Sequence, residues 1–154
     1  MVKVSVGDEL VSQPLKLRVR FDYKGVSKPG RFGFGGKNVE QVAEEAREQK
    51  VALLRNVPIQ GIQVENIDLN SEVYVVHDEI SGTEVAYAPV QLLITAGGLE
   101  DVIKLIMREE FRKIEVLEPD QMIMTRHDVE RFLFRTNEEL RAYRSLLERK
   151  VGSK

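Results

Sequence analysis

Cysteine and tryptophan are absent from this chain of 154 residues, and histidine occurs only twice. The lack of cysteine excludes disulfides, thiolate nucleophiles and metal sites built on sulfur. With two histidines, a metal site would depend on carboxylates whose positions the sequence does not give. We therefore predict no metal, no cofactor and a cytoplasmic location.

Long hydrophobic runs are also missing. The most apolar window, residues 85–99, contains Pro89, Gln91 and the Gly97-Gly98 pair, and it is too short to cross about 30 Å of hydrocarbon. The first residues meet charges early and lack the apolar segment of a signal peptide. We expect no membrane span and no export by that route.

The chain also lacks an excess of positive charge, because its 23 Lys and Arg residues are outnumbered by 25 Asp and Glu residues. The formal net charge of −2 gives no general attraction to nucleic acid or anionic lipid. A hydrophobic fraction of 42% with 31% charged residues is typical of a folded chain with a well-solvated surface. The abundance of Glu, Arg and Val leaves a thermophilic origin open.

The first half of the chain shows strand and helix patterns in turn. Residues 2–6 alternate as a short edge strand, and residues 15–23 alternate strictly, with a basic outer face. After a glycine-rich segment, Asn38 is placed to cap a helix that reaches about Lys50. The short apolar run Val51 to Leu54 predicts a buried strand, which Pro58 ends. Residues 59–70 have a looser pattern, typical of a connector with some extended structure.

The second half repeats this order. Residues 71–80 and 83–95 are rich in β-branched and aromatic residues, and Ser81-Gly82 between them predicts a hairpin. Gly97 and Gly98 precede a predicted helix from about Leu99 to Arg112, and a strand over residues 114–117 follows. Capping patterns at Thr125 and at Thr136 then predict one kinked helix, or two consecutive helices, to about residue 150.

These elements predict an α+β fold with an antiparallel or mixed sheet, built from two β-β-α-β units, and a long C-terminal helix or helix pair. Sliding the chain by 63 residues superposes Gly35 on Gly98 and Val39 on Val102, which suggests an internal repeat. The predicted organisation is an N-terminal half (1–58), a connector (59–70), a second half (71–124) and a helical segment (125–154). We expect them to form one compact domain.

The sharpest local motif is a glycine-rich segment between a strand and a helix. Such segments bind anions through exposed backbone N–H groups and the positive end of the helix. The spacing matches neither a phosphate-binding loop of the Walker type nor a dinucleotide fingerprint. A loop pinned by its phenylalanines is the simpler interpretation. As an alternative, we define a candidate site for a small anionic ligand, formed by Gly30, Arg31, Gly33, Gly35, Gly36, Lys37 and Asn38.

No catalytic constellation is apparent. His77 lies beside Asp78 and Glu79, and His127 beside Asp128, but a metal needs three or four groups that converge in space. No nucleophile elbow supports a serine-based triad. We therefore assign no catalytic residue and do not expect an enzyme.

The C-terminal segment carries the clearest interaction feature. Its arginines are interleaved with glutamates, which favours an ion-paired surface over a nucleic-acid surface. Its apolar residues follow a rhythm close to seven residues. Packing against the core accounts for most of them, and a partner chain would cover the part of the helix that extends past the core. We define the apolar seam as Val129, Leu133, Leu140, Tyr143 and Leu147.

The preferred hypothesis is a non-catalytic binding or assembly protein that forms a homo-oligomer through this seam. One alternative is a small enzyme or sensor that binds an anionic or phosphorylated ligand at residues 30–38. A second alternative is nucleic-acid binding through the arginine-rich helix, which the net charge disfavours.

Overall fold

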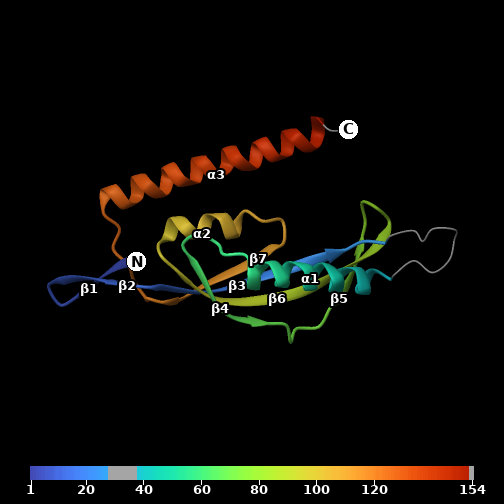
Figure 1. Ribbon diagram of the computed structural model, residues 1–154, viewed down its shortest axis with the longest axis horizontal. Helices are drawn as coiled ribbons and strands as arrows, with labels where there is room; N and C mark the ends of the chain where they lie inside the picture. Colours follow the sequence, from blue (N-terminus) through green and yellow to red (C-terminus); the bar gives the residue numbers. More distant parts are fainter. Residues whose placement is uncertain (28–37, 153–154) are drawn as a thin grey trace.

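The computed structural model describes residues 1–27 and 38–152. The elements, in chain order, are β1 (Val2–Val6), β2 (Glu9–Gln13), β3 (Leu15–Gly25), α1 (Val39–Asn56), β4 (Ile62–Asp68), β5 (Tyr74–Asp78), β6 (Thr83–Ala96), α2 (Leu99–Ile106), β7 (Phe111–Glu118) and α3 (Arg126–Gly152). The predicted α+β class with antiparallel sheets and a long C-terminal helix is confirmed. Figure 1 shows this arrangement, with α3 lying above α2 and away from the strands.

The main sheet has five antiparallel strands in the order β4-β6-β3-β7, with β5 also paired to β6. Its central pair, β3 and β6, runs in register from Leu15 opposite Ala96 to Gly25 opposite Ala86. Strands from both predicted halves of the chain therefore lie side by side in one sheet. A separate two-stranded ribbon of β1 and β2 joins the body through a bridge between Lys3 and Ile123.

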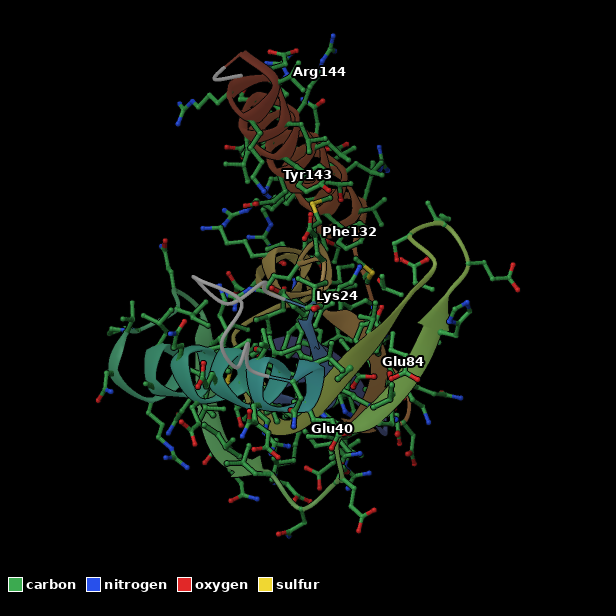
Figure 2. The ribbon with its side chains drawn as sticks, turned by 90° about the vertical axis from the view of Figure 1, so that its right-hand side faces the viewer. Lys24, Glu40, Glu84, Phe132, Tyr143 and Arg144 are labelled. Atoms are coloured by element: carbon green, nitrogen blue, oxygen red, sulfur yellow. The ribbon has the colours of Figure 1, made fainter. Side chains whose placement is uncertain are left out.

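Alternation along β3 creates the core as the sequence predicts. The apolar residues of its inward face are almost completely buried, and β6 supplies matching apolar residues from the neighbouring strand. Both α1 and α2 pack on this face, and Figure 2 shows α1 on one side of the strands. The central core residues are Leu15, Leu17, Val19, Phe21, Val90, Leu92, Ile94, Val51, Leu54, Val102 and Leu105.

The buried strand predicted at Val51 to Leu54 is wrong, because these residues form the last turns of α1. Val51 and Leu54 are buried, whereas Leu53 between them is 52% exposed, which is a helical and not an alternating pattern. Alanine and leucine favour helix, and no helix breaker occurs before Pro58. The 63-residue alignment therefore matches helical residues with strand residues here, and the structure gives no support to the proposed repeat.

Two further boundaries differ from the predictions, and the extended structure expected in the connector is a strand. The helix α2 ends at Ile106 instead of Arg112, because Phe111 pairs with Phe21 in the sheet. The β5–β6 hairpin has a four-residue connection, residues 79–82, in which Gly82 takes the positive φ of 70°. The connector at 59–70 contains β4, which pairs along β6. Tertiary pairing overrides local propensity in these places.

Candidate functional site

The helix α3 begins with the predicted capping box. The backbone N–H of Thr125 donates to Asp128 at 2.9 Å, and the backbone N–H of Asp128 donates to the Thr125 hydroxyl at 3.2 Å. These hydrogen bonds lower the pKa of Asp128 to about 2, with smaller contributions from the charges of Lys3 and Arg131. The Lys3 ammonium, 3.7 Å from the Asp128 carboxylate, also links α3 to β1.

The second predicted cap, at Thr136, is wrong. Its hydroxyl donates to the carbonyl of Phe132 at 2.8 Å, inside a helix that continues without a break. Threonine can satisfy its hydroxyl in this way without ending a helix. The segment is therefore one helix of 27 residues.

None of the described residues of α3 is buried, although the helix is the longest in the structure. Its inward side is only half-buried, and Phe132, Arg135 and Glu139 lie on that side. In Figure 2, Phe132 is labelled between α3 and α2, whereas Arg144 is labelled at the far end of α3. A long helix without buried side chains obtains little stability from packing on its own body.

The apolar seam lies on a side of α3 between the face toward the body and the face away from it. At 3.6 residues per turn, its residues lie roughly a quarter turn around the helix from the half-buried side. All five remain exposed, by 41% at Val129, 61% at Leu133, 53% at Leu140, 37% at Tyr143 and 41% at Leu147. The structure thus leaves this stripe of α3 exposed, although Tyr143 and Leu147 also line a cleft against the body.

Three of the arginines on α3 form ion pairs within the helix. Arg131 contacts Asp128 at 2.9 Å, Arg135 contacts Glu139 at 3.1 Å, and Arg144 contacts Glu148 at 3.2 Å. Such exposed pairs contribute little to stability, but they reduce the positive field of the helix.

The candidate anion site lies outside the described residues except for Asn38. The Asn38 side chain accepts the backbone N–H of Gln41 at 2.8 Å, and the Gln41 side chain accepts the N–H of Asn38 at 3.4 Å. The predicted cap is confirmed, and the side chain of Asn38 already has a structural role. Ligand binding by residues 30–37 stays a prediction.

The two histidines lie apart from each other, His77 in β5 and His127 at the start of α3. Among the described residues, His127 has its ionic contact with Glu130, at 4.0 Å, where both side chains are exposed. In the described part of the chain, no group of three or more His, Asp or Glu side chains is arranged to hold a metal ion.

The sequence did not reveal a buried polar cluster around Asp22. The Asp22 carboxylate is 2% exposed and accepts hydrogen bonds from Arg20 at 2.8 and 3.1 Å and from the Tyr74 hydroxyl at 2.6 Å. Burial, followed by the bond to Asp22, raises the pKa of Tyr74. Arg112 lies 3.8 Å from the carboxylate and 5.2 Å from the ring centre of Tyr87. The one signal for this cluster in the sequence was the position of Asp22 among the basic residues on the polar face of the predicted strand.

Within residues 1–27 and 38–152, no helix is both long enough and apolar enough to cross a lipid bilayer. Comparison of the chain with protein-family models, characterised proteins and solved structures gave no match.

Proposed function

We propose that this chain is a cytosolic, non-catalytic binding or assembly module that self-associates through the apolar seam of α3. One observation carries the proposal: a helix of 27 residues has no buried side chain and leaves an apolar stripe open along most of its length. Ordering such a helix costs conformational entropy, and burial of the stripe against a partner offsets that cost.

A second copy of the same helix fits this stripe. With Thr136 included, the seam residues are separated alternately by four and three positions from Val129 to Leu147. This spacing places them along the contact line of a two-stranded coiled coil. Thr136 is the one polar side chain in the line, and its hydroxyl is already satisfied by the carbonyl of Phe132.

The order of the seam residues favours an antiparallel pair. In that orientation Val129 faces Leu147 of the second copy, Leu133 faces Tyr143, and Thr136 faces Leu140, so that every layer contains at least one large apolar side chain. Glu130 and Arg144 flank the seam on one side and then meet each other across the interface, with complementary charge. The contact is isologous, as expected for a homodimer with twofold symmetry.

The intrahelical ion pairs support assembly over nucleic-acid binding. Three arginines of α3 have carboxylate partners within the helix, which leaves a weak net field for a phosphate backbone. An apolar seam flanked by paired charges is typical of a helix that binds another helix.

Light scattering coupled to size-exclusion chromatography tests the proposal. We expect a dimer for the unmodified chain and a monomer for Leu133→Glu and for Leu140→Glu. Phe134→Glu is the matched control, because Phe134 is 66% exposed but lies off the seam, and this variant should remain dimeric. A monomeric unmodified chain at the highest attainable concentration would rule out self-association.

A further inference from the structure

A cleft of about 500 Å³ lies between the C-terminal half of α3 and the body of the protein. Its apolar wall comes from the end of α1 on one side and from α3 on the other. Leu53 is 52% exposed and Leu146 is 47% exposed, while Leu54 lies deeper at 7%. The volume is within the range of small-molecule sites, and its walls are apolar where such sites usually are.

The floor of this cleft contains Tyr23, whose buried hydroxyl hydrogen-bonds no described residue. The residue is 3% exposed, and its ring stacks on Phe21 with centroids 6.3 Å apart. Tyr23 also lines a second cavity of about 460 Å³, which shares Lys50, Glu109 and Glu110 with the cleft. Buried polar groups normally have hydrogen-bond partners, so an unpaired hydroxyl between two cavities calls for an explanation.

The charges around Tyr23 define the group that would satisfy it. Burial, followed by the charge of Glu110, raises the pKa of Tyr23 to about 12, against an opposing effect of Arg108. The hydroxyl is therefore protonated at neutral pH and seeks an acceptor. Lys50, Arg108 and Lys150 line the same cleft and attract an anion, whereas Glu109 and Glu110 disfavour a doubly charged one.

We propose that the cleft binds a small amphipathic carboxylate. Its aliphatic chain lies between Leu53 on α1 and Leu146 on α3, and one carboxylate oxygen accepts a hydrogen bond from the Tyr23 hydroxyl beside Lys50. Contact with the hydroxyl requires rotation of flexible side chains at the shared boundary of the two cavities. The mixed charges of the lining residues favour a ligand with a single negative charge. The apolar walls favour a ligand with an aliphatic chain.

This inference does not depend on self-association. Of the seam residues, Tyr143 and Leu147 line the cleft, but Leu133 and Leu140 do not. A variant that disrupts the seam at Leu133 therefore leaves the walls of the cleft intact. Decanoate binding can therefore be tested in a monomeric Leu133→Glu chain, in which no partner helix covers Tyr143 or Leu147.

Isothermal titration calorimetry with sodium decanoate, below the concentration at which it forms micelles, tests the site. We expect saturable binding that weakens about tenfold or more in Tyr23→Phe, as for loss of one hydrogen bond to a charged group. Leu146→Ser should also weaken binding, whereas Phe134→Ser, outside the cleft, should not. Leu133→Glu keeps the walls of the cleft and exposes Tyr143 and Leu147, so it should bind decanoate at least as tightly as the unmodified chain.

Two ligand controls separate the carboxylate from the chain. Decan-1-ol should bind more weakly than decanoate, and decyltrimethylammonium should bind more weakly still. Thermal unfolding of Tyr23→Phe verifies that the variant is folded. Absence of saturable decanoate binding, or equal affinity of decanoate for the unmodified chain and for Tyr23→Phe, would overturn the proposal.

Discussion

The Tyr74 hydroxyl donates a 2.6 Å hydrogen bond to Oδ2 of Asp22, although the two residues lie on strands that do not pair with each other. Asp22 is on β3 and Tyr74 is on β5, and β6 separates them in the sheet. The bond therefore ties the outer strand β5 to the centre of the sheet, on the face opposite α1. Because Asp22 is buried, the bond also satisfies a carboxylate that water does not reach.

Tyr74→Phe should lower the free energy of unfolding by about 1–3 kcal/mol, because it removes a hydrogen bond to a buried charge. Urea unfolding followed by circular dichroism measures the change. Tyr87→Phe is the matched control, because Tyr87 stacks on Tyr74 with centroids 5.4 Å apart while its hydroxyl hydrogen-bonds no described residue. Equal effects of the two variants would mean that ring packing, and not the bond to Asp22, holds β5.

Acid should loosen the start of α3 through Asp128. Its pKa is about 2 in the folded chain against an ordinary value of 3.8, so the unfolded chain binds its proton first as the pH falls. The stabilisation from the capping box is complete above about pH 4 and is lost as the pH approaches 2. Carboxyl NMR titration should show the low pKa directly.

The variant Asp128→Asn removes the titrating group. The free energy of unfolding of this variant should no longer show the decrease between pH 4 and 2 that Asp128 causes. Asp120→Asn, in the loop just before α3, should still show that decrease. If Asp128 titrates at its ordinary value in the folded chain, the capping box of α3 does not persist in solution.

Gly25→Ala should destabilise the fold by about 3 kcal/mol, because a Cβ at this position would overlap the backbone nitrogen of Ala43 and the carbonyl oxygen of Val39. The first turns of α1 approach β3 too closely for any side chain there. Gly152→Ala, with no atom within 4 Å of the added carbon, should be neutral or slightly stabilising. Differential scanning calorimetry of the two variants compares them. A Gly25→Ala chain as stable as the original would place α1 further from the sheet.

Tyr23→Phe should raise the free energy of unfolding by about 1 kcal/mol in the absence of ligand, because it removes a buried hydroxyl that no described residue satisfies. Chemical unfolding at neutral pH measures the gain. A clear loss of stability in this variant would show that the hydroxyl has a partner in the unliganded protein.

Alkaline pH should increase the difference in the free energy of unfolding between the unmodified chain and Tyr23→Phe. The raised pKa of Tyr23, about 12 against an ordinary 10, means that the unfolded chain releases this proton first as the pH rises. The corresponding stability is complete below pH 10 and is lost between pH 10 and 12. Ultraviolet absorbance of tyrosinate, followed with pH, should show one fewer late-titrating tyrosine in the variant.

Strict alternation was sufficient to predict the centre of the fold. Leu15, Leu17, Val19 and Phe21 were expected on one face of a strand, and all four are buried in the core. The caps at Asn38 and Thr125 were also predictable, because a side-chain oxygen at the start of a helix satisfies a nearby backbone N–H with few alternatives. The strand and the two helix caps depend on residues close together in the sequence, which is why they could be predicted.

Longer-range relationships were beyond the sequence. The run Val51 to Leu54 fits a buried strand or a buried helix equally well, and only the position of the sheet decides between them. The Asp22 cluster and the unpaired hydroxyl of Tyr23 depend on strands and helices far apart in the chain. The apolar spacing of the seam on α3 could be read from the sequence. Its exposure could not, because it depends on how far the rest of the fold extends along the helix.

The pairing of β3 with β6 has a consequence for the newly made chain. Leu15 can pair with Ala96 only after the 80 intervening residues have been synthesised, so the apolar face of β3 stays unprotected until then. Its other face carries Lys16, Arg18 and Arg20, which oppose stacking of exposed strands from neighbouring nascent chains. We therefore expect the alternation that builds the core to reduce aggregation of the unfinished chain as well.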